Sequence, residues 1–556
     1  MKSLIRFKRA PLLWTTGAVL GTTLLLLVAH GLGAEKTKRG ARHLPRHVLE
    51  DKIRGGWAGQ MIGVSYGAPT EFHAQGKTFD AELKWTPDMI ANAIHQDDLY
   101  VEMTFAAVMD RVGLDATSEQ YGDAFRDSKY GLWHANAAAR RNLNRGIKAP
   151  LSGHPKHNLH ANDIDFQIEA DFIGLMCPGL PRESNKFCDR VGRVMNYGDG
   201  LYGGMFVCGM YAAAFFESDP RAVVEAGLAC IPPRSDYARL IRDLLDWSAQ
   251  QPDDWRKVWL LIEAKWDKDD PCPDGALSPF NIDAKLNGAY IAFGLLYGQG
   301  DFRRTMEIST RCGQDSDCNP SSAAGVLGVM LGYARIPDEF KSGNAKLADE
   351  KFEFTDYSFN SICESTVKRA LKIIDQAGGK VTATEVVIPY QSPKPPKLEQ
   401  WDPGIPDKKI AASAPIWSWK GNWSESKGAM TSETAGNEAT LKFTGVAVAV
   451  IGQLDQQGGR AQLYLDGRKA GVLDAYIVER THDNALWHTY GLKPGEHTLR
   501  IVTLPDADPR SKGRKLTIDR AVVYRPRHTK PDVIPLTSHR RWHDITNAAD
   551  GIFLSF

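Results

Sequence analysis

The sequence has almost no net charge and lacks the basic clusters that bind nucleic acid. Among its 556 residues, 68 Lys and Arg stand against 67 Asp and Glu. No basic patch with interleaved aromatic side chains is visible, so a nucleic-acid partner is not expected. Hydrophobic residues make up 43% of the chain and charged residues 24%, as in ordinary globular proteins. The length favours more than one domain.

Cysteine is absent from both ends of the chain. All eight cysteines fall between Cys177 and Cys363. They form no CxxC pair and no Cys/His spacing typical of a zinc site. If the protein is exported, we expect some of them to pair as disulfides, in a connectivity that the sequence leaves open.

Long hydrophobic runs are absent except at the N-terminus. Residues 1–34 carry four basic residues and no acidic one, followed by an apolar run and small residues. This is the pattern of a secretory signal peptide, and it predicts a secreted or periplasmic protein with a short spacer at 35–48. The alternative is an uncleaved N-terminal anchor. No other segment is long enough to span a bilayer, so no further membrane partner is expected.

The middle of the chain has helical periodicity. Segments such as "DDLYVEMTFAAVMDRVG" and "NGAYIAFGLLYG" place apolar residues at helical spacing, and Gly and Pro separate them. We therefore predict an all-α domain over residues 49–388.

The C-terminal part has a different character. Six prolines between Pro389 and Pro406 predict a stiff linker at 389–410. Segments rich in β-branched residues then alternate with period two, and "LDGR" predicts a tight hairpin turn. The sequence thus predicts a multidomain protein in which an all-β sandwich over 411–527 follows the helices, with a tail at 528–556.

Two acidic motifs lie far apart in the helical domain. One is Asp97-Asp98 in "AIHQDDLYVEMTF", and the other is Asp315 and Asp317 in "RCGQDSDCNPSS". At a helix N-terminus both acids of a pair can face one cavity. The glycine-spaced run after Asp317 predicts close helix packing that buries these acids, and buried acids need a cation. Four carboxylates predict a hard divalent ion bound by oxygen.

Four segments resemble the ADP-ribosylglycohydrolase family in order and spacing. They are "DKIRGGWAGQMIGVSYGAPTEF", "HQDDLYVEMTF", "NYGDGLYGGMFVCGMYAAAF" and "CGQDSDCNPSSAAGVLGVMLGY". The resemblance covers about residues 51–336. It implies an orthogonal all-α bundle with a two-metal site, usually magnesium or manganese. It also implies cleavage of the N- or O-glycosidic bond at the anomeric carbon of an ADP-ribosyl group.

The resemblance assigns metal ligands to both acidic motifs. The family's Thr-Asp-Asp motif corresponds to Gln96, Asp97 and Asp98, and its Asp-x-Asp-Thr motif to Asp315, Ser316, Asp317 and Cys318. Both ligand threonines are thus replaced, here by Gln96 and Cys318. We expect one or two divalent ions, namely Mg, Mn or Ca. The family's glutamate in its Gly-x-Pro-x-Glu turn corresponds to Glu71.

Polar residues in the middle of the helical domain are predicted to bind substrate. The segment "HANDIDFQIEADFIGLM" falls where the family lines its ribose pocket, and "NYGDG" adds further polar groups. The predicted substrate-binding residues are His95, Asn162, Asp163, Asp165, Tyr197 and Asp199. In the predicted sandwich, Trp417, Trp419, Trp423 and Trp487 are candidates for stacking on sugar rings, or else they are core residues.

The export pattern and the predicted sandwich favour a carbohydrate or other glycoside as substrate. We therefore expect a secreted metal-dependent glycoside hydrolase that acts with inversion. Glu71 is the first candidate for the acid, with Asp163 and Asp165 as rivals; Asp98 and Asp317 are the other predicted catalytic residues. The alternatives are an ADP-ribosyl hydrolase, a hydrolase of nucleoside-like N-glycosides, and a carbohydrate-binding protein without activity.

Overall fold

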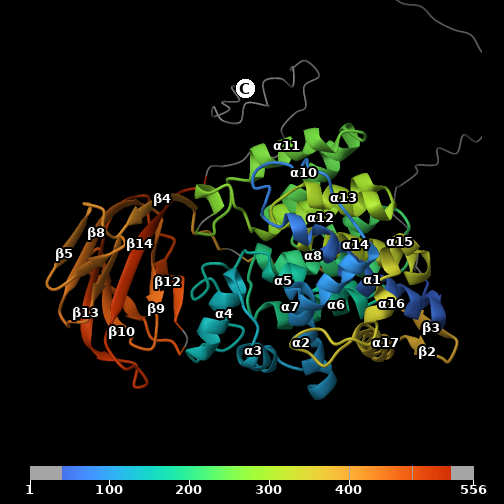
Figure 1. Cartoon of the computed structure of the whole chain (residues 1–556), viewed down its shortest axis with the longest axis horizontal. Helices are drawn as coiled ribbons and strands as arrows, with labels where there is room; N and C mark the ends of the chain where they lie inside the picture. The colour runs from blue at the N-terminus through green and yellow to red at the C-terminus, as the bar shows by residue number, and fades with distance from the viewer. Residues whose placement is uncertain (1–39, 274, 400, 479, 528–556) are drawn as a thin grey trace, which may run out of the picture. The chain divides into compact units, whose positions relative to one another are not determined.

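The computed structural model describes residues 40–273, 275–399, 401–478 and 480–527 (Figure 1). The predicted signal peptide and the predicted tail lie outside these described residues. Within them, no helix combines the length and the apolar character that crossing a membrane requires.

The first part of the described chain is helical, as the sequence predicts. Short 3-10 turns η1 (Ala68–Thr70), η2 (Pro87–His95), η3 (Gly275–Leu277) and η4 (Tyr333–Arg335) interrupt the α-helices. The α-helices are α1 (Arg46–Gly67), α2 (Asp97–Val112), α3 (Ser118–Asp127), α4 (His134–Asn144), α5 (Asp165–Ile168), α6 (Asp171–Leu175), α7 (Pro181–Gly192), α8 (Asp199–Ala214), α9 (Pro220–Leu228), α10 (Asp236–Gln250), α11 (Trp255–Trp266), α12 (Ala284–Gly298), α13 (Phe302–Arg311), α14 (Cys318–Leu331), α15 (Asp338–Lys341), α16 (Asn344–Leu347) and α17 (Phe359–Gln376).

Helices α8, α12 and α14 form the centre of the helical domain (Figure 1). Each is buried around nearly its whole circumference, because its residues are apolar or small on every face. A helix of this kind packs in the core instead of on the surface. Helix α14 begins directly after the second acidic motif, so the packing of the core fixes the position of Asp317.

Helix α1 packs against α14 through a row of glycines. A Cβ atom at Gly59 would lie 2.2 Å from the carbonyl oxygen of Ala324, and one at Gly63 would lie 2.2 Å from that of Pro320. Only glycine allows the two backbones to approach this closely. The close helix packing predicted from the glycine-spaced run is therefore confirmed at Gly328, where a Cβ would lie 2.1 Å from the carbonyl oxygen of Gly55.

The C-terminal part consists of antiparallel strands. They form a sheet of order β11-β10-β13-β8-β5 and a sheet of order β12-β9-β14-β7-β6, in which β4 also pairs with β14. The strands are β4 (Ile405–Ala411), β5 (Trp417–Lys420), β6 (Ser424–Ser426), β7 (Ala429–Ser432), β8 (Glu438–Gly445), β9 (Ala447–Leu454), β10 (Gly459–Leu465), β11 (Arg468–Asp474), β12 (Thr481–Thr489), β13 (Gly495–Ala507) and β14 (Leu516–Arg525).

A shared apolar core confirms that the two sheets face each other. Leu441 and Leu463 of one sheet pack in one cluster with Val450 and Ile518 of the other. The "LDGR" hairpin is present between β10 and β11, and its two central residues have φ angles of +50° and +78°. These angles match the tight turn that Asp-Gly favours. The fold class predicted from the sequence is therefore confirmed.

Two details differ from the sequence interpretation. Strand β1 (Arg42–Pro45) and the start of α1 fall within the predicted spacer, and β1 pairs with β3 (Glu385–Ile388), next to β2 (Lys380–Val381). The prediction that some of the cysteines form disulfides was wrong. All eight cysteines lie within the described residues as buried free thiols. Five of them pack in the apolar core as small side chains, namely Cys177, Cys188, Cys208, Cys312 and Cys363.

Candidate active site

Both acidic motifs lie at helix N-termini, as the sequence predicts. Asp97 is the first residue of α2, and Gln96 before it is still extended; Asp317 directly precedes α14. The Cys318 sulfur lies within 4.8 Å of ligand oxygens of Asp97 and Asp98, and likewise of Asp315 and Asp317. The fold therefore brings the two distant motifs together around Cys318.

Three of the aspartates are buried, and few hydrogen bonds stabilise their charged carboxylates. Asp98, Asp315 and Asp317 are only 2%, 3% and 2% exposed. Within the described part of the chain, neither carboxylate oxygen of Asp98 has a hydrogen-bond partner of normal geometry. An unpartnered buried carboxylate is costly unless a cation neutralises it. The donor set therefore fits the hard divalent ion that the sequence predicts.

Burial raises the pKa of all four carboxyls. Desolvation and the charge of Asp317 raise the pKa of Asp97 to about 6, and burial with its acidic neighbours raises the pKa of Asp98 well above its usual range. Desolvation is also the main cause of the raised pKa of Asp315 and of Asp317. Four acids this close together ionise fully only when positive charge lies between them.

Glu71 follows the end of α1 and faces the same aspartates. Its side chain is exposed, yet its carboxyl is partly surrounded by protein. This desolvation, together with the charges of Asp317 and Asp97, raises its pKa to about 7. The turn before it is held to the second acidic motif, because the hydroxyls of Thr70 and Ser316 share a 2.8 Å hydrogen bond.

A cavity of about 300 Å³ lies against these groups, although Asp98 and Asp317 are not among the residues that line it. It is lined by seven residues that the sequence predicted, namely Glu71, His95, Gln96, Asp97, Asp165, Asp315 and Cys318. Aromatic side chains form much of the remaining wall: Phe72, Tyr100, Trp133 and Phe280. Trp133 is 59% exposed. An exposed indole beside carboxylates is suited to stacking on the apolar face of a sugar ring.

Four predicted substrate-binding residues do not line this cavity. Asn162 and Asp199 line another cavity, of about 470 Å³. Tyr197 packs on His154 with ring centroids 4.8 Å apart. The side chain of Asp163 is fully buried. These residues lie in turns or at the start of a helix. The polarity of the local sequence does not show which cavity such a residue faces.

Asp165 lines the cavity but also has a positioning role. Its two carboxylate oxygens accept hydrogen bonds from the backbone N–H groups of Ala135 and Asn136, at 3.2 and 2.9 Å. Asp165 thus caps α4 and fixes the neighbouring His134 and Trp133. The pKa of Asp165 is raised to about 7, chiefly by desolvation.

The sequence interpretation missed the start of α4. Trp133, His134 and Asn136 line the cavity with Phe72 and Phe280. The one available signal was the segment "GLWHAN", in which two aromatic rings and an amide interrupt an alanine-rich helix.

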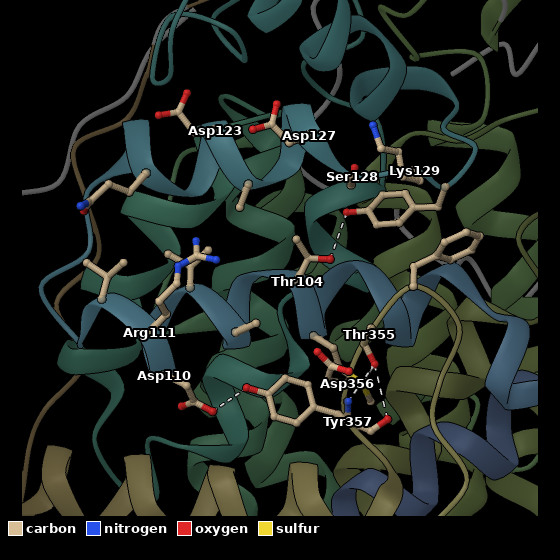
Figure 2. Close-up of a pocket in the computed structure, with 18 of the residues that line it drawn as sticks. Thr104, Asp110, Arg111, Asp123, Asp127, Ser128, Lys129, Thr355, Asp356 and Tyr357 are labelled. Carbon is tan, nitrogen blue, oxygen red and sulfur yellow. Dashed lines mark hydrogen bonds between the residues drawn. The ribbon is translucent and has the colours of Figure 1, made fainter.

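A wider cavity of about 1110 Å³ lies between α2, α3 and the loop that carries Thr355 and Tyr357 (Figure 2). Polar side chains in this cavity form hydrogen bonds with one another. The Tyr130 hydroxyl donates to the Thr104 hydroxyl at 3.3 Å, and the Tyr357 hydroxyl donates to the Asp110 carboxylate. None of the site residues predicted from the sequence is among the described residues that line it. The smaller cavity is therefore the candidate active site.

Comparisons with known proteins identify the family of the helical part. A family model described as ADP-ribosylglycohydrolase matches residues 45–366, more than half of the chain. A solved ADP-ribosylglycohydrolase-related protein complex is 14% identical with a TM-score of 0.40, and the match covers 58% of this chain and 98% of that one.

Two curated proteins of Flavonifractor plautii are similar to parts of the chain. One, an A type blood alpha-D-galactosamine galactosaminidase, is 32% identical over 102 residues, which is 17% of this chain and 9% of that protein. The other, an A type blood N-acetyl-alpha-D-galactosamine deacetylase, is 29% identical over 185 residues, which is 32% of this chain and 23% of that protein. The chain thus spans less than a quarter of either relative.

Proposed function

Because the chain belongs to the ADP-ribosylglycohydrolase family, we propose that it is an exported, metal-dependent hydrolase that cleaves the glycosidic bond of a carbohydrate or other glycoside. The observation that carries this proposal is the meeting of two acidic motifs around Cys318, where Asp97 and Asp315 line one cavity and the unpartnered carboxylate of Asp98 lies buried behind them. Export rests on the N-terminal sequence pattern alone.

The metal ligands proposed are Asp97, Asp98, Asp315 and Asp317, with Gln96 as a further oxygen donor. Cys318 occupies the centre of the group, but a thiol is a poor ligand for a hard ion. The neighbouring Asn319 has a buried amide oxygen without a hydrogen-bond partner among the described residues, and it is the substitute donor. A bound divalent ion would supply positive charge that orients sugar hydroxyls and acidifies water.

The chain's own residues would move the protons. Glu71, with its raised pKa, is protonated often enough near neutral pH to donate to the leaving oxygen. Asp317 is the proposed acceptor for the proton of the attacking water. Since this route has no covalent intermediate, we expect inversion at the anomeric carbon.

The cavity dimensions and the aromatic wall favour a small sugar group. About 300 Å³ is at the lower end of ligand-binding sites, and Trp133 offers an exposed stacking face. The sandwich is the proposed carbohydrate-binding part, and Trp423 lines a separate cavity on it. Because two relatives are named for galactosamine derivatives, amino sugars belong first in any substrate panel.

Two other functions compete with this one. The family match supports hydrolysis of ADP-ribosyl linkages. The replacement of both ligand threonines supports a carbohydrate-binding protein that has lost catalysis.

A substrate panel separates the three functions. The purified chain is incubated with Mg, Mn or Ca and with aryl glycosides, amino-sugar oligosaccharides, a nucleoside and ADP-ribosyl-arginine. We expect release of sugar from a glycoside, abolished in the Asp317→Asn variant. Turnover of ADP-ribosyl-arginine alone would overturn the carbohydrate proposal, and sugar binding without turnover under any metal would overturn the enzymatic one.

A further inference from the structure

A second group of metal-ligating side chains lies beside the candidate active site. His134, His160 and Asp163 bring two ring nitrogens and a carboxylate oxygen within 4.8 Å of one another. Asp163 also belongs to an adjoining group with Asp270 and Cys272, whose ligand atoms meet the same limit. None of these five residues is among the four aspartates assigned to the first metal site.

The distances in the first group suit a single bound ion. The Nδ1 atoms of His160 and His134 lie 2.8 and 3.6 Å from the same oxygen of Asp163. Two donors bound tetrahedrally to one zinc ion, each at about 2.0–2.1 Å, would be about 3.3 Å apart. The two observed distances bracket this value, and the shorter one is a hydrogen bond between His160 and Asp163 that the ion would replace.

The adjoining group carries negative charge that its hydrogen bonds do not fully satisfy. Asp270 is 1% exposed, and its Oδ2 has no hydrogen-bond partner among the described residues, while its Oδ1 accepts from the Cys272 backbone at 2.8 Å. The nearby Lys285 forms its ion pair with Asp283 instead. A buried carboxylate oxygen in this state favours a cation beside it.

The backbone already holds these ligands in place. His134 has a φ of +42°, which is rare for a residue other than glycine, and its ring stacks on Phe280 with centroids 5.5 Å apart. The turn that carries His160 and Asp163 is closed by a 2.9 Å backbone hydrogen bond between them. Asn196 donates to the Asp163 carbonyl at 2.7 Å.

We propose that His134, His160 and Asp163 bind one borderline-soft divalent cation of the zinc class, and that Asp270 and Cys272 supply further negative charge beside the shared carboxylate. Imidazole nitrogens favour zinc over magnesium or calcium, whereas the aspartate site offers mainly oxygen. The chain would therefore hold two different metals at neighbouring sites.

The position of His134 gives this second ion a place in the cavity wall. His134 lines the 300 Å³ cavity together with Glu71 and Asp97. A site with three protein ligands leaves a coordination position for water or for a substrate oxygen. Of the three ligands only His134 lines the cavity, so the second ion would lie behind its wall, and its binding does not depend on the proposed hydrolysis.

Metal analysis of the full purified chain tests this inference. The protein is stripped with a chelator, incubated with zinc in excess Mg²⁺, desalted, and its zinc measured by mass spectrometry. We expect one zinc per wild-type chain, and a loss of at least tenfold in zinc affinity in His160→Gln and Asp163→Asn. Asp98→Asn should keep its zinc. Cys363→Ser, which changes a buried cysteine outside the group, is the control and should also keep its zinc.

If a variant fails to fold, X-ray absorption at the zinc edge of the wild-type protein still tests the proposal. In the wild-type protein it should show two imidazole ligands. No retained zinc, coordination by oxygen alone, or unchanged zinc in a folded His160→Gln variant would each overturn the proposal.

Discussion

A Cβ atom added to Gly67 would lie 2.1 Å from the carbonyl oxygen of Ser316. Gly67 is the last residue of α1, four residues before Glu71, and Ser316 stands between the two aspartates of the second acidic motif. The contact between them therefore fixes the predicted acid relative to the predicted metal ligands. Whether Glu71 and the metal ligands can come together therefore depends on the lack of a side chain at Gly67.

The Gly67→Ala variant should be less stable and should lose metal affinity. Since the clash is with backbone, it cannot be relieved by rotating a side chain, and we expect a loss of about 1–3 kcal/mol in unfolding free energy. Thermal unfolding with and without Mn²⁺ measures both effects. The control is Gly122→Ala in α3, where the atoms nearest to the added Cβ are side-chain atoms of Leu143 and Ala149, at 3.1 and 3.2 Å. Equal losses in the two variants would contradict this account.

The Asp98→Asn variant should be more stable without metal and less active in hydrolysis. Removing one buried charge relieves repulsion, so the metal-free variant should melt at a higher temperature than the metal-free wild type. At the same time, hydrolysis should fall by about 100-fold or more, and added Mn²⁺ should no longer raise the melting temperature. Asp88→Asn, at an exposed position paired with Lys346, is the control. A metal-free variant that is less stable than wild type would refute the role of unneutralised charge.

The Glu71→Gln variant should keep its metal and lose turnover. A general acid contributes about 10²- to 10⁴-fold to rate, so kcat should fall by that factor while KM and Mn²⁺ affinity stay near the wild-type values. Steady-state kinetics and titration calorimetry provide the two readouts. If kcat is unchanged, proton donation passes to Asp165, the remaining sequence-predicted rival that lines the cavity.

The fold and the acidic motifs could be predicted from sequence because they depend on local signals. Helical periodicity, the change to β-branched alternation, and acids placed before helices all act over short stretches. The position of Asn162 and Asp199 could not be predicted, because polar density does not show which cavity a turn faces. The group around Asp163 could not be predicted either, since its ligands come from three separate segments, namely the start of α4, the turn at 160–163 and residues 270–272, without zinc-motif spacing.

The Trp133→Ala variant should bind substrate more weakly. Loss of a stacking face costs up to about 1.5 kcal/mol beyond area burial, which corresponds to roughly a tenfold increase in KM, with kcat little changed. The control is Phe354→Ala. Phe354 is similarly exposed, at 54%, but lines the wider cavity. A larger effect at Phe354 would move the substrate site to that cavity.

The stability of the helical domain should depend on pH through Glu263. Desolvation, with the charge of Asp267, raises the pKa of this carboxyl from 4.5 to about 8. The folded state therefore keeps a proton that the unfolded state releases, so this contribution is complete below about pH 4.5 and is lost as pH rises toward 8.

The Glu263→Gln variant should remove that dependence, because glutamine stays neutral and can still accept from Tyr290. Its melting temperature relative to wild type should increase steadily between pH 5 and 8, as measured by thermal unfolding at each pH. The surface variant Glu82→Gln should show no such trend. A difference that is constant with pH would show that Glu263 ionises normally in the folded state.

The most direct test of the central claim is glycoside hydrolysis by chelator-treated protein as Mn²⁺ is added back. The account predicts no turnover in the stripped wild-type chain, saturable recovery with added Mn²⁺, and no recovery in Asp317→Asn. Full turnover without any divalent ion, or recovery in Asp317→Asn equal to wild type, would contradict it.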